Sequence, residues 1–264
     1  MNLMRFCILV VGLCFIVITT TNAAIDPDTI MGMWLFNEGT GNTVKDSSAN
    51  GNDGKIEGGV KRVDGKFGNG IELNGSDGWV TVDHSDTVGF KKGTSFTITV
   101  YFKGTKVAGA LVGKGYEDTS QVLPWFLLWN GGQDNKVTLF LRNTASQSFR
   151  AESTSEIGDD KWHFVAGIAD AESGKISIWI DGKKEAEVEF DNNDDYGTTE
   201  SVLHFGRHYD RYTAGIIDEV GLFSTALDED DMNTIMDNGL EEAASVDAKQ
   251  KLTTTWGRIK NKVQ

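Results

Sequence analysis

Apolar and polar residues alternate in short runs along most of this chain. The clearest runs are Phe96, Ile98, Val100 and Phe102, then Val137, Leu139 and Leu141, then Ile176, Ile178 and Ile180. A period of two places every second side chain on one face of a strand. Such runs recur at intervals of about 8–12 residues and are separated by Gly, Asn and Asp, which is typical of an all-β sandwich or barrel.

The alternation predicts strands over most of residues 31–223. Asp181-Gly182 lies between two of them and supplies the positive backbone dihedrals of a tight hairpin, so these two should be antiparallel neighbours. The expected strands are Met31–Asn37, Gly70–Asn74, Trp79–Asp83, Ser95–Phe102, Ala110–Gly113, Trp125–Trp129, Lys136–Arg142, Trp162–Ala169, Lys175–Asp181, Lys184–Phe190, Ser201–Gly206 and Ala214–Phe223.

One internal helix is expected, from Asp228 to Asn238. Asp228 is a suitable N-cap, and Gly239 is a suitable C-cap. The chain then ends in a basic segment, residues 241–264, in which Leu252, Trp256, Ile259 and Val263 recur at helical spacing. We therefore expect one β-sandwich domain over residues 24–240, followed by an amphipathic helical tail that either contacts the cell envelope, docks or frays.

Residues 1–23 have the pattern of an export signal. Arg5 precedes an apolar stretch, Phe6–Ile18, and small residues follow it up to Ala23. Both cysteines, Cys7 and Cys14, lie inside this segment. A mature chain would therefore lack thiols, which excludes disulfides, cysteine nucleophiles and cysteine-bound zinc, and we expect a secreted or cell-surface protein.

The 264 residues include 39 acidic and 25 basic ones, for a formal net charge of −14. Such an excess of negative charge repels phosphate backbones. Nucleic acid is therefore not an expected partner.

Several motifs occur in the order found in one known family. Met33–Gly41, Asp46–Gly54 and Gly65–Leu73 resemble the opening of laminin G-like jelly-roll domains of the concanavalin A-like lectin/glucanase superfamily. The later matching segments are Ser95–Ile98, Lys161–Gly167, Ile178–Gly182, His204–Arg207 and Gly215–Val220. The resemblance covers about residues 31–240 and implies two packed antiparallel sheets.

The segment Asp46–Gly54 is rich in Asp, Asn, Ser and Gly, which supply the hard oxygen ligands that calcium prefers. The family resemblance implies one structural calcium ion that joins this loop to the strand around Asp218, with Asp46, Asn50, Asn52 and Asp218 as ligands. The alternative is a turn that the same residue types close by local hydrogen bonds, without a metal.

Two aromatic segments suggest a binding platform. One contains Tyr116, Trp125 and Trp129, and the other contains Arg207, His208, Tyr209, Arg211 and Tyr212. Aromatic rings stack on sugar faces and arginine supplies polar contacts. We therefore predict Arg207, Tyr209, Tyr212 and Trp125 as ligand-binding residues, with core filling as the alternative; Trp34, Trp79, Trp162 and Trp179 are expected in the core.

No catalytic arrangement is evident. The acids Glu185, Glu187, Glu189 and Asp191 share a strand face, but their order differs from that of glycosidases of this superfamily and no Trp or Tyr lies between them. The four histidines are scattered. The sequence thus predicts a non-catalytic module that binds carbohydrate or an extracellular protein; the alternatives are a glycoside hydrolase or lyase on the same fold, and a structural adhesin or envelope component.

Overall fold

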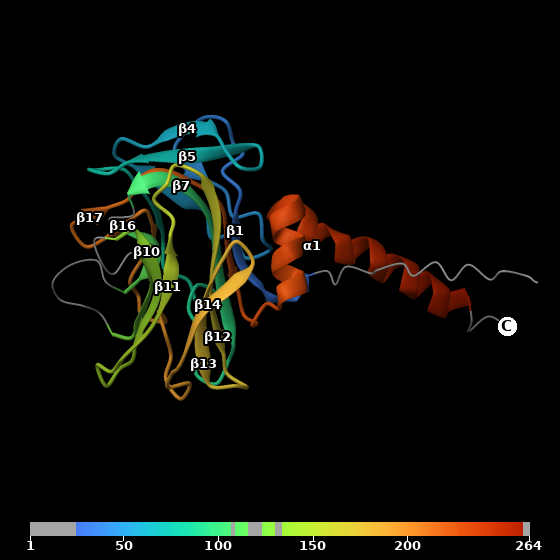
Figure 1. Cartoon of the computed structure of the whole chain (residues 1–264). Coiled ribbons are helices and arrows are strands. Elements are labelled where there is room, and N and C mark those ends of the chain that lie inside the picture. The colour runs from blue at the N-terminus through green and yellow to red at the C-terminus, as the bar shows by residue number, and fades with distance from the viewer. Residues whose placement is uncertain (1–24, 107–108, 116–122, 130–133, 261–264) are drawn as a thin grey trace, which may run out of the picture.

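The protein is a sandwich of two antiparallel β-sheets with a helix against one side (Figure 1). The structure is a computed structural model that describes residues 25–106, 109–115, 123–129 and 134–260. The predicted export signal, Tyr116 and the last four residues lie outside these ranges. The all-β prediction of two packed antiparallel sheets is confirmed.

Sheet A has the strand order β14-β13-β12-β7-β18-β5-β4, with β1 paired to β18. Its strands are β1 (Ile30–Trp34), β4 (Lys61–Asp64), β5 (Asn69–Asn74), β7 (Phe96–Lys106), β12 (Trp162–Asp170), β13 (Lys175–Ile180), β14 (Lys183–Glu189) and β18 (Ala214–Phe223).

Sheet B has the order β11-β10-β9-β8-β15-β6-β3-β2. Its strands are β2 (Thr43–Val44), β3 (Gly54–Glu57), β6 (Trp79–Val82), β8 (Ala110–Lys114), β9 (Trp125–Trp129), β10 (Lys136–Arg142), β11 (Ser148–Glu156) and β15 (Leu203–Phe205). A separate hairpin of β16 (Arg207–His208) and β17 (Arg211–Tyr212) follows β15.

The main core fills the space between the two sheets. Ile98, Val100, Leu139 and Ile178 are fully buried there, as their alternation predicts. Trp34 is also buried, and its ring meets Phe205 of the opposite sheet edge-on at 4.9 Å. The predicted hairpin is present, since β13 pairs antiparallel with β14 across Asp181-Gly182, and both residues have positive φ.

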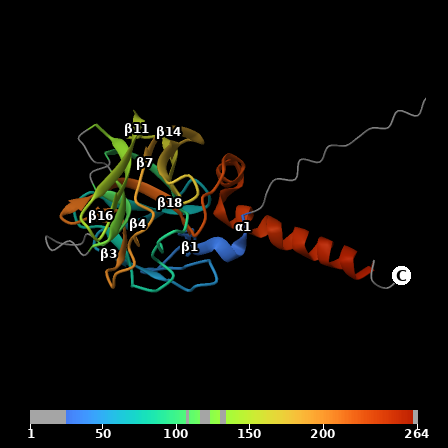
Figure 2. The same ribbon diagram turned by 90° about the horizontal axis from the view of Figure 1, so that it is seen from below.

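A second apolar cluster covers the outer face of sheet A. The first part of helix α1 (Glu229–Lys260) packs Met232, Ile235 and Leu240 against Tyr101, Phe164 and Ile168. Figure 2 shows this helix along one side of the sandwich, with its second part extending away from the sheets. The first part of α1 therefore covers the part of the outer face of sheet A that contains Tyr101, Phe164 and Ile168.

The first part of α1 starts and ends where the sequence predicts. Asp228 caps the helix, because its carboxylate accepts the Asp231 amide at 2.9 Å. At Gly239 the backbone leaves helical geometry (φ 79°, ψ 169°), and a second helical segment begins at Leu240. A short 3-10 turn, η1 (Pro27–Thr29), precedes β1. None of the helices in the described ranges is long and apolar enough to cross a bilayer.

Candidate functional site

The outer face of sheet B carries a cluster of aromatic side chains. Phe126 and Leu128 of β9 enter the main core, so Trp125, Leu127 and Trp129 face outward by alternation. The partner strand β10 places Phe140 opposite Leu127, and Phe140 contacts both tryptophans, with ring centroids 4.6 Å from Trp125 and 6.3 Å from Trp129. This set, Trp125, Leu127, Trp129 and Phe140, is called the aromatic cluster below.

The hairpin β16–β17 adds a second stack beside it. Its turn contains Tyr209, whose positive φ of 57° closes the reversal, and the Tyr209 carbonyl accepts Arg207 Nε at 2.9 Å. The Arg207 guanidinium lies 4.7 Å from the Trp79 ring and 5.9 Å from the Tyr212 ring. The two rings also contact each other, with centroids 5.8 Å apart, so the guanidinium lies beside both of them and is attracted to both by cation–π interaction.

The hairpin and the aromatic cluster form one continuous surface. Trp129 meets the ring of His208 at 4.8 Å, and the Arg211 guanidinium lies 5.5 Å from the Trp129 ring. On the other side, the Arg150 guanidinium lies 4.2 Å from Phe140. The two segments in which the sequence predicts binding residues therefore meet in space, although about 80 residues separate them.

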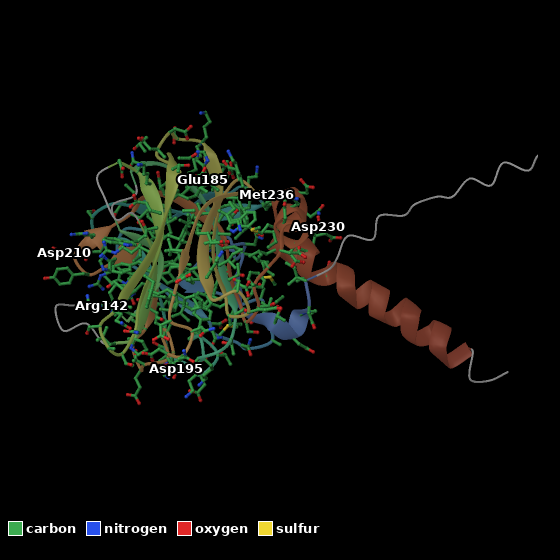
Figure 3. The ribbon with its side chains drawn as sticks, turned by 60° about the horizontal axis from the view of Figure 1, so that its bottom comes forward. Arg142, Glu185, Asp195, Asp210, Asp230 and Met236 are labelled. Atoms are coloured by element: carbon green, nitrogen blue, oxygen red, sulfur yellow. The ribbon has the colours of Figure 1, made fainter. Side chains whose placement is uncertain are left out.

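Figure 3 shows where this surface lies relative to the helix. Arg142 at the end of β10 and Asp210 at the hairpin tip lie on the side of the sandwich opposite Asp230 and Met236 of α1. We call the surface formed by the aromatic cluster, Trp79, the β16–β17 hairpin, Arg142 and Arg150 the arginine-aromatic face.

The predicted ligand residues occupy different depths of this face. Arg207, Tyr209 and Tyr212 are half-buried at its surface, whereas Trp125 is only 2% exposed and supports the face from below. Trp79 was expected in the core, and this expectation is wrong: Val80 and Val82 take the inward positions of β6, so Trp79 faces out. Phe140, Arg142 and Arg150 were not predicted from the sequence. The alternation of inward and outward side chains along β10 and β11 is the signal that places them on this face.

The histidines on this face are neutral at physiological pH. Burial is the larger of two causes that lower the pKa of His204 to about 4, and repulsion from Arg207 is the smaller. Burial and repulsion from Arg211 lower the pKa of His208 to about 3. The positive charge of the face at neutral pH therefore comes from its arginines.

The predicted calcium ligands make hydrogen bonds with the backbone. Asp46 is 8% exposed, and its carboxylate accepts the amides of Met33 and Ser48 at 2.9 Å each and that of Asn52 at 2.8 Å. The side-chain amide of Asn50 donates to the Ile30 carbonyl. The Asn52 side chain donates to the Met31 carbonyl and to Thr87.

Asp218 is fully buried in β18 and accepts the amides of Lys66, Phe67 and Glu219 at 2.8–3.0 Å. It thus binds a different backbone segment from Asp46. No group of three or more His, Cys, Asp or Glu side chains suited to a metal occurs within the described ranges. As arranged, the four residues do not fit a calcium cage, because the Asp46 and Asp218 carboxylates face N–H donors and the amides of the two asparagines donate to backbone carbonyls.

We expect Asp46→Ala to lower the free energy of unfolding by about 2 kcal/mol, because it leaves three buried backbone donors without an acceptor. Asp53→Ala in the same loop is the matched control. The Asp53 carboxylate is 38% exposed and pairs with Lys45, so its loss should cost less than about 1 kcal/mol. Urea denaturation of both variants measures the difference, and equal losses would contradict this role of Asp46.

Repeating the melt with calcium and with chelator tests the calcium prediction. A bound structural ion raises the Tm of the parent protein above its value in chelator. Equal melting temperatures would leave the Asp46 loop as a turn closed by hydrogen bonds alone.

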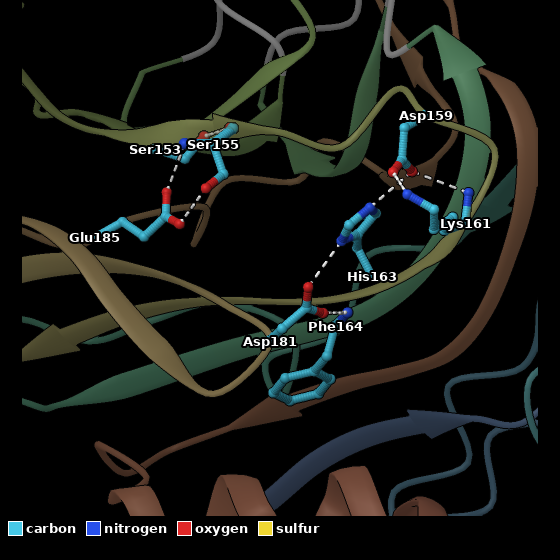
Figure 4. Close-up of polar contacts among 8 residues, drawn as sticks. All are labelled: Ser153, Ser155, Asp159, Lys161, His163, Phe164, Asp181 and Glu185. Atoms are coloured by element: carbon cyan, nitrogen blue, oxygen red, sulfur yellow. Dashed lines mark hydrogen bonds and ion pairs between the residues drawn. The ribbon is translucent and has the colours of Figure 1, made fainter.

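Acidic side chains on the opposite side of the molecule are paired with other groups (Figure 4). Glu185 accepts the backbone amide of Ser155 at 2.8 Å and its hydroxyl at 2.6 Å. Glu187 binds Lys175 and Lys184 at 2.7 Å each, and these hydrogen bonds lower its pKa. The acidic side chains of β14 therefore make the contacts expected of a solvent-exposed strand face.

His163 lies between two carboxylates, with Nδ1 2.8 Å from Asp181 and Nε2 2.9 Å from Asp159 (Figure 4). Burial alone would lower the pKa of His163. The hydrogen bonds that its ring makes to the Asp181 and Asp159 carboxylates outweigh burial and raise the pKa above its usual value. Lys161 binds the same Asp159 carboxylate. The cluster connects β12 to the β13–β14 turn.

Comparison with known proteins identifies the family. A profile described as the concanavalin A-like lectin/glucanases superfamily, of laminin G type, matches residues 74–233, which is more than half of the chain. The chain belongs to this superfamily. A comparison with curated proteins finds no match.

Solved structures share the fold at low sequence identity. The binding domain of Paraclostridial Mosquitocidal Protein 1 is 15% identical, with a TM-score of 0.63 over 79% of this chain and 52% of that one. Domain 4 of AbnA, an extracellular GH43 arabinanase from Geobacillus stearothermophilus solved with arabinotriose, is 16% identical, with a TM-score of 0.60 over 83% of this chain and 98% of that one.

The binding domain of botulinum neurotoxin DC, solved with rat synaptotagmin II, is 18% identical, with a TM-score of 0.60 over 81% of this chain and 52% of that one. This chain thus spans about half the length of the two toxin binding domains and nearly the whole of the arabinanase domain. At these identities the likeness shows the fold alone.

Proposed function

We propose that this protein is an exported, non-catalytic recognition module that binds a carbohydrate through the arginine-aromatic face of sheet B. The observation that carries the proposal is the contact of Arg207 with the adjacent rings of Trp79 and Tyr212, next to Trp129 with Arg211. Flat rings offer stacking surfaces for sugars, and fixed guanidinium groups supply directed hydrogen bonds.

The accessible rings of the face are those of Trp79 and Tyr212. Both are half-buried, and their centroids lie 5.8 Å apart with the ring planes tilted by 48°. The members of the aromatic cluster are at most 9% exposed, so they support the face from below. A sugar ring can therefore stack at the Trp79–Tyr212 pair, next to the guanidinium groups.

Fold relatives support the same class of partner. Domain 4 of AbnA was solved with arabinotriose, and the binding domain of botulinum neurotoxin DC was solved once with SialylT and once with synaptotagmin II. A protein partner at the same face is therefore the main alternative to a carbohydrate. Export agrees with a partner outside the cell, since the first 23 residues have the pattern of a signal segment.

The experiment is a glycan-array screen of the protein, followed by affinity measurements on the saccharide that binds. Trp79→Ala should weaken binding by about tenfold or more, because it removes a stacking surface and releases Arg207. Trp179→Ala is the matched control: this half-buried tryptophan of sheet A also donates its indole N–H to a nearby hydroxyl and also lies under a cation, Lys184.

Equal losses in the two variants would place binding elsewhere and contradict the proposal. Release of reducing sugar from any bound polysaccharide would contradict its non-catalytic part. If the array shows no binding and an extracellular protein binds in a Trp79-dependent way, the face recognises protein and not carbohydrate.

A further inference from the structure

The distribution of arginine in this chain is uneven. Residues 24–240 contain five arginines, and four of them, Arg142, Arg150, Arg207 and Arg211, lie on the arginine-aromatic face. The chain as a whole carries a formal charge of −14. A cluster of fixed positive charge on an acidic protein is an electrostatic feature that attracts anions to one place on the surface.

These four guanidinium groups have no acidic partner within the part of the chain that the structure describes. The fifth arginine, Arg62, forms an ion pair with Glu38 at 2.7 Å. Several lysines in the described ranges also form ion pairs with Asp or Glu. Arg150, Arg207 and Arg211 lie over aromatic rings instead. The carboxylates in the described ranges therefore do not neutralise the positive charge of these arginines.

Stacking on a ring leaves the edge of a guanidinium available. The planar fork presents parallel N–H donors that match the two oxygens of a carboxylate or of a sulfate. Arg142 lies opposite Trp125 in the β9–β10 register, and its buried Nε has no hydrogen-bond partner among the described residues. The face thus offers several donors at fixed positions along the aromatic cluster.

The acids on this face do not cancel this charge. Glu57 already binds Lys55 at 2.7 Å, and Asp210 is at the exposed tip of the hairpin. Glu152 accepts the Thr138 hydroxyl at 3.3 Å. None of these three carboxylates forms an ion pair with an arginine of the face within the described residues.

We infer that the ligand of the arginine-aromatic face is an acidic saccharide, whose rings stack on the aromatic side chains while its carboxylate or sulfate groups bind the arginines. This inference rests on the proposed function and adds the charge of the ligand to it. A saccharide fits better than an acidic peptide, because the arginines alternate with flat rings instead of forming a purely basic patch.

The test compares polygalacturonate, a uronate polymer, with its methyl ester, which keeps the sugar rings and removes the charge. Heparin is a third probe that carries sulfate. With chelator present, to prevent gelling by calcium, we expect polygalacturonate or heparin to bind at least about tenfold more tightly than the methyl ester, and added salt to weaken that binding. The acidic probe that binds more tightly identifies the anionic group.

Two variants connect the result to the face. Arg150→Gln and Arg211→Gln should each weaken binding of the acidic probe by about fivefold or more. Lys184→Gln is the control, because this lysine also lies over a tryptophan but already binds Glu187. Both arginines are exposed, so these substitutions leave the core intact, and unchanged melting temperatures verify this.

The outcomes separate the two proposals. Equal binding of the polymer and its methyl ester, with Trp79→Ala still weakening it, would contradict the acidic ligand and keep the carbohydrate face. Equal binding of polyglutamate and the acidic saccharides would overturn the saccharide class. Loss of binding in Lys184→Gln, or no effect of the arginine variants, would overturn the inference itself.

Discussion

At about pH 9, the Glu219→Gln variant is expected to be more stable than the parent protein by about 4 kcal/mol. Glu219 is 2% exposed in β18 and accepts the backbone amide of Leu240, where helix α1 resumes. Burial is the largest cause that raises the pKa of Glu219 to about 8, and repulsion from Asp218 and Glu241 adds to it. The hydrogen bond from the Leu240 amide lowers this pKa but does not outweigh burial.

The sign follows from the proton that the folded protein retains. An unfolded glutamate releases its proton near its ordinary value of 4.5, whereas folded Glu219 keeps it until about pH 8. The free energy of unfolding therefore falls as the pH rises through this interval. Glutamine has no proton to lose, so the variant should match the parent near about pH 5 and exceed it above about pH 8.

Urea denaturation across this pH interval measures the effect. Asp218, whose pKa burial raises to about 7, contributes in the same direction in both proteins, and its repulsion of Glu219 is part of the difference that the comparison measures. Glu241→Gln is the control, because Glu241 is an exposed neighbour and its removal should change little. Parallel pH profiles for the parent and Glu219→Gln would contradict the account of a buried, protonated glutamate.

The second large effect is expected for Gly206→Ala, with a loss of about 3 kcal/mol in the free energy of unfolding. Gly206 has a φ of 86° and connects β15 to the β16–β17 hairpin. A Cβ atom at this position would lie 2.4 Å from Cδ1 of the buried Leu73. The methyl group therefore adds a steric overlap in the core to the cost of the left-handed backbone.

A matched control separates these two costs. Gly41 has nearly the same φ, 83°, but a Cβ atom there would have nothing within 4 Å. Gly41→Ala should thus cost only about 1 kcal/mol. Because Gly206 directs the chain into the hairpin that carries Arg207, we also expect Gly206→Ala to weaken ligand binding; equal effects of the two substitutions on stability would contradict the packing argument.

The strands with an apolar face were predictable from the sequence, and those without one were not. β11 (Ser148–Glu156) was missed because most of its side chains are exposed, and only Ala151 and Ser153 are buried. The two-residue strands β16 and β17 are too short to show a period. The end of the first helix at Gly239 was predictable, because this glycine leaves helical geometry there and a second helical segment begins at Leu240.

The site was predictable in its residue types and not in its geometry. Composition alone suggested an aromatic platform from two distant segments, but the contact between Trp129 and His208 depends on strand register and on the path of the chain after Gly206. The Asp46 loop shows the same limit. Calcium sites and Asx turns use the same residue types, and only the structure shows the Asp46 carboxylate facing three backbone amides.

Binding at the arginine-aromatic face can be observed directly through the NMR signals of the tryptophan indole N–H groups during titration with the saccharide that binds. Trp79 and Trp179 both donate this N–H to a nearby hydroxyl at 2.9 Å, on opposite sheets. The account predicts that the Trp79 signal shifts and saturates with the ligand while the Trp179 signal stays unchanged. A shift at Trp179 with Trp79 unaffected would contradict binding at the arginine-aromatic face.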